Sequence, residues 1–283
     1  MTSTVFPGEL IDDMPEAEYH AHSALSSSGA RKLLPPSCPA RFRWERDNPP
    51  ESTRTLDFGS AAHSIVLGRG AEIVVVDAKD WRTKAAQEQQ EAAYAAGHIP
   101  VLTKEMAVIE AMAAALRQHP VASALLNPDR GRPEQSLFWS DPDSGVYCRA
   151  RFDWLPEPSS GRLIIPDYKT SNSALPEAFA KSCASYGYQQ QASWYLDAAR
   201  ALELAEELAF VFVVQEKTAP YLVTVCDLDW EALRVGARLN RLAREVFAEC
   251  TATDTWPSYT DEVAHISLPG WFLRQHDNLM ESA

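Results

Sequence analysis

The stretch Leu163-Ile164-Ile165-Pro166-Asp167-Tyr168-Lys169 decides the fold of this chain. Its three aliphatic residues predict a short buried strand that runs directly into an acid and a base. Asp167 and Lys169 are two positions apart, so on a strand their side chains project to the same face. Because Pro166 cannot donate to a strand ladder, we expect a bulge or distortion at that point. The pattern predicts either an active site or an ion pair at a strand end.

The segment before this strand predicts a β-hairpin with one strongly polar face. Residues 135–140 and 146–154 have strand character, and an Asp-, Pro- and Gly-containing turn separates them. In the second strand Arg149, Arg151 and Asp153 alternate onto one face. A carboxylate beside two arginines is unusual for a purely structural hairpin. The hairpin therefore favours the active-site interpretation of the strand that follows it.

Helical patterns surround these strands. We expect a helix that starts near Asp57 or Gly59 and carries His63 on its early turns. Residues 81–97 are polar and rich in Ala, which indicates either a mobile helix or a lid. Further helices are predicted over residues 26–34, 103–118, 186–207 and 229–249, and further strands over residues 73–76, 209–215 and 221–227.

One predicted helix has a polar and aromatic stripe. Tyr188, Gln191 and Tyr195 are spaced i, i+3 and i+7, which places them on one side of the helix. The stripe is typical of aromatic side chains that pack on a sheet. Taken alone, the stripe favours this packing, but polar contacts to a ligand remain open as the second interpretation.

Composition indicates one large globular domain in a reducing compartment. The chain has 283 residues, of which 46% are hydrophobic and 23% charged, enough to bury a sizeable core. No apolar run is long enough to span a membrane, and the N-terminus lacks the pattern of a signal peptide. Its five cysteines are scattered and form no Cys-x-x-Cys pair. We expect a cytoplasmic protein without structural zinc or an iron–sulfur cluster.

The net charge of −13 argues against simple binding to nucleic acid, where a basic patch normally supplies affinity. Two observations weaken that argument. Divalent cations partly neutralise a site that is rich in carboxylates. Basic residues also gather in the segment before His63, although they are equally compatible with an ordinary solvated surface. They are Arg31, Lys32, Arg41, Arg43, Arg46 and Arg54.

The order Gly-x-x-x-His, Glu, Asp, Asp-x-Lys and Gln-x-x-x-Tyr resembles the PD-(D/E)XK nuclease superfamily. Within it, the chain is most similar to the C-terminal nuclease domain of RecE-type phage and prophage exonucleases (exodeoxyribonuclease VIII). The resemblance runs from about residue 19 to about residue 275. Its matching segments are residues 19–21, 55–63, 134–139, 148–153, 167–170, 186–188, 191–195 and 267–271.

This resemblance implies an α/β (α+β) fold with a restriction-endonuclease-like core, in which helices flank a central mixed sheet. It implies a single nuclease domain over residues 19–275, between an N-terminal extension at 1–18 and a C-terminal tail at 276–283. Asp153, Asp167, Lys169 and Glu134 would be catalytic. The metal ligands would be His63, Asp153, Asp167 and the main-chain carbonyl of Tyr168. The implied DNA contacts are Gln191, Tyr195, Tyr188, Arg149, Arg151, Arg54 and Thr170.

The activity that the resemblance implies is a magnesium-dependent exonuclease acting on linear double-stranded DNA. It would use two Mg²⁺ ions, with Mn²⁺ as a substitute, digest 5′ to 3′ and leave 3′ single-stranded tails for recombination. Its implied partners are a RecT-type single-strand annealing protein and further copies of itself in a ring. Two alternatives remain open: an endonuclease or single-strand repair nuclease on the same core, and a non-catalytic DNA-binding protein with a degenerate site.

Overall fold

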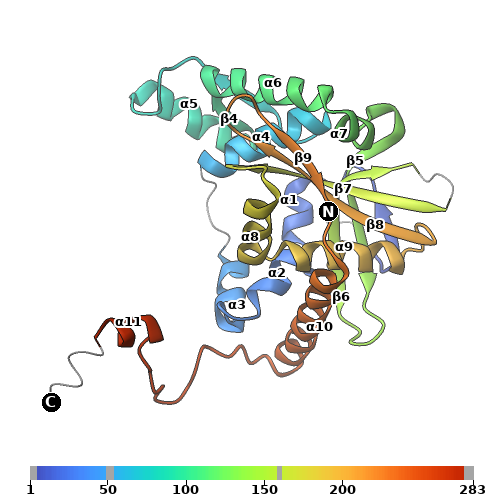
Figure 1. Ribbon diagram of the computed structural model, residues 1–283, viewed down its shortest axis with the longest axis vertical. Coiled ribbons are helices and arrows are strands. Elements are labelled where there is room, and N and C mark those ends of the chain that lie inside the picture. Colours follow the sequence, from blue (N-terminus) through green and yellow to red (C-terminus); the bar gives the residue numbers. More distant parts are fainter. Residues whose placement is uncertain (1–4, 49–53, 158–160, 277–283) are drawn as a thin grey trace.

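The computed structural model describes residues 5–48, 54–157 and 161–276 (Figure 1). Its strands are β1 (Glu9–Ile11), β2 (Leu25–Ser26), β3 (Ile73–Val76), β4 (Ile99–Leu102), β5 (Gly131–Ser140), β6 (Tyr147–Pro156), β7 (Arg162–Ser171), β8 (Glu207–Glu216) and β9 (Val223–Cys226). Its helices are α1 (Glu16–Ala21), α2 (Ser27–Lys32), α3 (Pro39–Asp47), α4 (Arg54–Leu67), α5 (Lys84–Ala95), α6 (Thr103–Gln118), α7 (Pro120–Leu125), α8 (Pro176–Tyr186), α9 (Tyr188–Ala201), α10 (Trp230–Thr253) and α11 (Gly270–Gln275), with a short 3₁₀ turn at Pro128–Arg130.

The mixed α/β architecture predicted from the sequence is confirmed, although the strands form three hydrogen-bonded sheets. A four-stranded sheet has the order β1-β5-β6-β2, and a three-stranded sheet has the order β7-β8-β9. The strands β3 and β4 form a small parallel pair. The two larger sheets meet where β6 lies beside β7, and we call this junction the seam. There the Asp153 carboxylate of β6 accepts the backbone N–H of Tyr168 in β7 at 2.8 Å. A side chain thus replaces a ladder bond at this seam.

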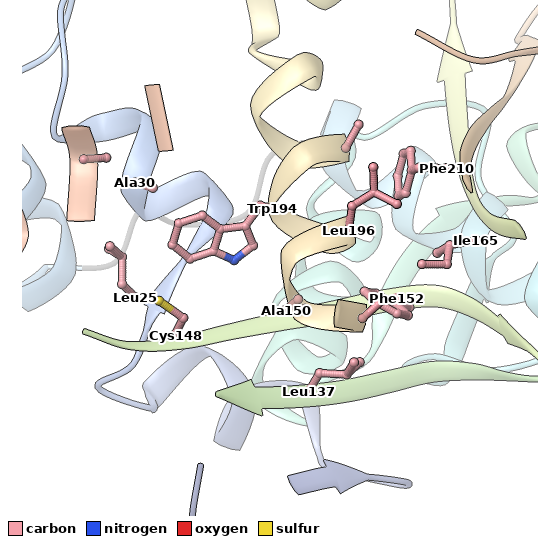
Figure 2. Close-up of a cluster of buried hydrophobic side chains, with 14 of the residues drawn as sticks. Leu25, Ala30, Leu137, Cys148, Ala150, Phe152, Ile165, Trp194, Leu196 and Phe210 are labelled. Atoms are coloured by element: carbon pink, nitrogen blue, oxygen red, sulfur yellow. The ribbon is translucent and has the colours of Figure 1, made fainter. Parts of the chain in front are cut away.

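Helices cover both sides of the seam. On one side α9 packs over β6, β7 and β8, and Figure 2 shows its Trp194 beside Ala30 and Cys148. The Trp194 side chain is fully buried, and burial of such a side chain contributes about 1.5–3 kcal/mol. On the other side α4 and α6 pack over Tyr168 and Val213. The seam is therefore held rigidly between two apolar layers.

The helix expected over residues 186–207 is wrong in its length, and a preceding helix was missed. The structure has two helices, α8 and α9, with Gly187 between them in the left-handed conformation at φ 69°. Glycine adopts this conformation without a steric penalty, so it ends one helix and lets the chain turn into the next. Helix α9 stops at Ala201, and β8 begins at Glu207.

The predicted distortion at Pro166 is also wrong. β7 pairs with β8 in unbroken parallel register from Arg162 to Ser171. Residues two apart on a strand direct their backbone nitrogens to the same side, and the N–H of Tyr168 points to β6 rather than β8. The nitrogen of Pro166 thus also faces β6. The missing donor of Pro166 therefore falls on the side where no ladder runs, which is how proline is tolerated in strands.

The two ends of the chain behave differently. The N-terminal extension expected at residues 1–18 supplies strand β1, which pairs with β5 at the edge of the sheet, so its described part belongs to the body. The C-terminal segment after α10 instead runs away from the body and ends in α11 (Figure 1). Of the predicted tail at 276–283, residues 277–283 lie outside the described residues. None of the described helices has the length and apolarity that a membrane span requires.

Candidate active site

The seam between β6 and β7 brings the two predicted acids together with the lysine. Asp167 is fully buried, and its Oδ1 accepts a hydrogen bond from Gln191 Nε2 of α9 at 2.7 Å. Its Oδ2 lies 2.5 Å from Lys169 Nζ, an ion pair without a well-aligned hydrogen bond. Asp153 lies next to this pair across the seam and holds the amide of Tyr168. The same-face arrangement predicted for Asp167 and Lys169 is therefore present.

A break in the hairpin ladder lies directly beside these acids. Pro133 pairs with Trp154 and Gln135 pairs with Phe152, but Glu134, opposite Asp153, is missing from the ladder. Glu134 has a φ of 54°, a left-handed conformation that costs a non-glycine residue about 1–3 kcal/mol. Such a break re-aims side chains and is common next to active sites. This break lies on β5, on the far side of β6 from Pro166.

His63 reaches the same place from the opposite layer. Its Nδ1 lies 3.6 Å from Asp153 Oδ2, and its ring packs on Tyr168 with 5.0 Å between ring centroids. Helix α4 begins at Arg54, so His63 lies on the third turn rather than on the early turns that were predicted. Burial, followed by the charge of Lys169, lowers the pKa of His63 to about 4. At neutral pH its ring is uncharged, the form that binds metals.

Burial makes the carboxylates poor acids. Burial, reinforced by the nearby Asp153 charge, raises the pKa of Asp167 to about 6 and that of Glu134 to about 7. The pKa of Asp153 is raised by burial as well. For Lys169, burial alone would lower the pKa, but the Asp167 and Asp153 carboxylates outweigh it and raise the pKa above its ordinary value. When Asp153 and Asp167 are both ionised, their two negative charges face the one positive charge of Lys169.

The stripe on α9 packs on the sheet through its two tyrosines and contacts the acid cluster through Gln191. Gln191 contacts Asp167 directly, as a ligand-supporting residue would. The Lys169 ammonium lies 5.2 Å from the centre of the Tyr188 ring, and that ring packs on Phe179 and Phe212. Tyr195 packs on Phe152 of β6 at 5.2 Å. These tyrosines belong to the layer that supports the site, and their predicted DNA contacts remain predictions.

The two arginines of β6 hold the N-terminal segment in place. Arg149 is buried and donates to the main-chain carbonyls of Tyr19 and His22. Arg151 donates to Met14 O at 2.8 Å, and its Nη1 lies 3.8 Å from Glu134 Oε2. This geometry gives Arg149 a structural role, and the predicted DNA contact of Arg149 gains no support from it. Arg151 also belongs to the surroundings of the acid cluster.

Of the remaining predicted contacts, Thr170 follows Lys169 on β7 and lies close to Gly59 of α4. Arg54 opens α4, but its side chain lies outside the described residues. The pattern of the sequence did not reveal Arg69, whose charge acts on Glu134 and whose guanidinium pairs with Asp12 at 2.9 Å. It stands just after α4 with no motif around it, so only the folded chain shows its position.

The chemistry of the donors fits a hard divalent cation. Asp153 and Asp167 offer carboxylate oxygens, and one oxygen of Asp167 is buried without a well-directed hydrogen bond. The Tyr168 carbonyl points to the same edge of β7 as its amide, toward Asp153. Mg²⁺ prefers oxygen ligands of this kind. Among the described residues, no three His, Cys, Asp or Glu side chains already form a metal-binding group, and Lys169 pairs with Asp167.

The fold and this cluster of two acids and a lysine define a protein of the PD-(D/E)XK class. The chain matches the family described as "PDDEXK-like domain of unknown function (DUF3799)" over residues 26–269, and it belongs to that family. A comparison with curated proteins finds no match.

Twelve chains among the solved structures match this chain, and they include the following two. A protein from Eubacterium rectale, provisionally described as an exonuclease, has a TM-score of 0.58 and 12% sequence identity. That match covers 92% of this chain and 95% of that chain, and it shows a shared fold. The structure of SSO0001 is 16% identical over 68% of this chain and 84% of that chain, but its TM-score of 0.29 carries no argument.

Proposed function

We propose that this protein is a metal-dependent nuclease that cleaves DNA at the cluster formed by Asp153, Asp167 and Lys169. One observation carries the proposal: two carboxylates on adjacent strands, Asp167 fully buried and Asp153 partly buried, share a single lysine. Burial raises the pKa of both carboxyl groups even beside Lys169, so their ionised forms would gain from further positive charge. A divalent cation would supply it, and Mg²⁺ or Mn²⁺ suits the oxygen donors. His63 and the Tyr168 carbonyl would complete its surroundings.

The residues of the chain have distinct parts in the proposed reaction. Lys169 stays protonated at neutral pH, since its pKa is raised, so its Nζ donates to the phosphate and stabilises developing negative charge. Gln191 fixes the orientation of Asp167. A bound divalent cation supplies Lewis-acid polarisation of the phosphodiester oxygens. Glu134, whose pKa is raised to about 7, can accept or hold a proton near neutral pH.

The finer assignment follows the resemblance of the motifs to RecE-type exonucleases. We propose that the substrate is linear double-stranded DNA, digested 5′ to 3′ to leave 3′ single-stranded tails for recombination. Two ions, a RecT-type annealing partner, a ring of identical subunits and a cytoplasmic location belong to the same proposal. The Gly-x-x-x-His, Asp-x-Lys and Gln-x-x-x-Tyr motifs, in this order, support it.

The test compares linear duplex, nicked circle and closed circle of one DNA, each with Mg²⁺ or with EDTA. The proteins are wild type, Asp167→Asn, Lys169→Ala and, as a matched control, Asp143→Asn in the exposed turn after β5. We expect magnesium-dependent loss of the linear form alone, and a rate lower by about a hundredfold or more in the two site variants. Asp143→Asn should match wild type.

Other outcomes separate the alternatives. Cleavage of the closed circle would replace the exonuclease with an endonuclease on the same core. DNA binding without degradation of any form would overturn the catalytic proposal and leave a binding protein. Radioactive label released first from the 5′ end, rather than the 3′ end, would establish the polarity proposed here.

A further inference from the structure

The segment after α10, residues 254–276, forms an arm whose root is firmly attached to the body. Trp256 stacks on Phe42 of α3 with 5.7 Å between ring centroids and also packs against Phe247 of α10. The carbonyl of Pro257 accepts the N–H of Ala40 at 3.0 Å. Asp254, in the left-handed conformation with φ 48°, turns the chain out of α10. These contacts fix the direction in which the arm leaves.

Beyond this root the arm carries apolar side chains that remain open to solvent. Val263 is 89% exposed, Ile266 87% and Trp271 62%. Leu268 and Leu273 are exposed as well. The arm and α11 lead away from the rest of the molecule (Figure 1). Apolar side chains that are not buried against their own chain are typical of a segment that binds another surface.

A second unpartnered apolar surface lies on the outer side of α10. Val235 and Leu242, seven residues apart on one helix face, are 44% and 46% exposed. They lie in a groove of about 330 Å³, the α10 groove, lined by Val235, Arg238, Leu239, Arg241, Leu242 and Glu245. The opposite side of α10 packs on α9 through buried residues such as Gly236 and Asn240. The α10 groove is thus the outward half of an otherwise well-packed helix.

The arm and the α10 groove complement each other in charge as well as in apolarity. Asp261 and Glu262 precede the apolar residues of the arm. Arg238 and Arg241 flank the apolar centre of the groove. Arg241 pairs with Glu245 at 3.8 Å, but both side chains are about three-fifths exposed, so this pair is weak and can be exchanged.

We propose that the arm of one copy of this protein binds in the α10 groove of a second copy. Val263, Ile266 and Leu268 would cover Val235 and Leu242, with the two acids of the arm beside the two arginines. The contact joins two different surfaces, so it is heterologous. Repeated from copy to copy it closes into a ring, and in a dimer the two copies exchange their arms reciprocally. The inference deepens the homo-oligomer part of the proposed function and rests on that part alone, not on the nuclease reaction.

The first test is the mass in solution of wild type and three variants, by light scattering after size exclusion. Ile266→Glu lies in the arm, Leu242→Glu in the groove, and Val121→Glu places the same change on exposed α7 as the matched control. We expect wild type and Val121→Glu to have a multiple of 31.4 kDa, and each of the other two to be a monomer. A wild-type monomer, or an oligomer unchanged in both variants, would overturn the proposal.

The second test shows whether the arm binds its own α10 or that of another copy. Copies with Leu242→Cys are mixed with size-tagged copies with Ile266→Cys and oxidised, and each variant alone serves as the control for the native cysteines. A mixed dimer specific to the mixture is expected. A double variant that carries Leu242→Cys and Ile266→Cys in one chain is oxidised in parallel. If its disulfide forms only within one chain, the arm binds its own α10 and the proposal fails. Cleavage of linear DNA by the same samples tells this failure apart from failure of the nuclease proposal.

Discussion

At the residue scale, the two acids of the seam oppose the stability of the fold. Asp167 is fully buried, and its pKa is raised to about 6 from an ordinary value of 3.8, so the folded state pays to keep this group ionised at neutral pH. The ion pair with Lys169 offsets only part of that cost. Retention of destabilising charge in a buried position is typical of functional sites rather than of structural ones.

Substitution of Asp167 should therefore stabilise the metal-free protein. We expect Asp167→Asn to raise the free energy of unfolding by about 1–3 kcal/mol at pH 7.5 in EDTA, because the neutral amide avoids the ionisation cost. A raised acid pKa favours folding below the unfolded value, near pH 4, and this contribution is lost as the pH rises through about 6. The stability gap between Asp167→Asn and wild type should accordingly widen from pH 4 to pH 7.5. Urea denaturation measures it, and a variant less stable than wild type at pH 7.5 would contradict this account.

At the element scale, the position of Gln191 depends on how closely α9 approaches α10. A Cβ on Gly236 of α10 would lie 2.0 Å from the carbonyl oxygen of Gln189, so the two helices can touch only through glycine. Asn240 of α10 also donates to the carbonyl of Gln190 at 2.9 Å. The close packing of α9 on α10 thus determines where the Gln191 side chain lies relative to Asp167.

Gly236→Ala should separate α9 from α10. We expect a loss of stability of about 1–3 kcal/mol, because a methyl group has no space there, together with a lower rate of DNA cleavage. Gly59→Ala is the matched control: Gly59 also lies in a helix, but its Cβ would meet nothing closer than 3.9 Å. It should be neutral or stabilising by up to about 1 kcal/mol. Thermal unfolding measures the stability of the two variants. Equal changes in stability would contradict the close approach of α9 and α10 at Gly236.

The elements also show what the sequence could and could not reveal. Local patterns were sufficient for the helix Thr103–Gln118, whose predicted limits are those of α6, and for the strand that carries Asp167. They were insufficient where long-range contacts decide. The break at Glu134 depends on its position opposite Asp153, and the regular path of Pro166 depends on which neighbour lies on each side of β7. The local sequence pattern shows neither the partner of Glu134 across the hairpin nor the strands that lie beside β7.

At the scale of the whole molecule, the acidic net charge and the proposed affinity for DNA have to be reconciled. Some of the basic charge is engaged within the protein: Arg149 donates to carbonyls of the N-terminal segment, and Lys32 pairs with Glu45. The uncompensated acids lie at the seam, where divalent cations would reverse the local charge. DNA binding by this protein should therefore depend on the metal, and not on salt alone.

The most direct measurement takes wild type, Asp167→Asn and Asp143→Asn and determines, on the same samples at pH 7.5, Mn²⁺ binding by calorimetry and cleavage of linear duplex. We expect wild type and Asp143→Asn to bind the ion and cleave, whereas folded Asp167→Asn does neither. Cleavage by Asp167→Asn at the wild-type rate, or a wild type that binds no ion, would contradict this expectation.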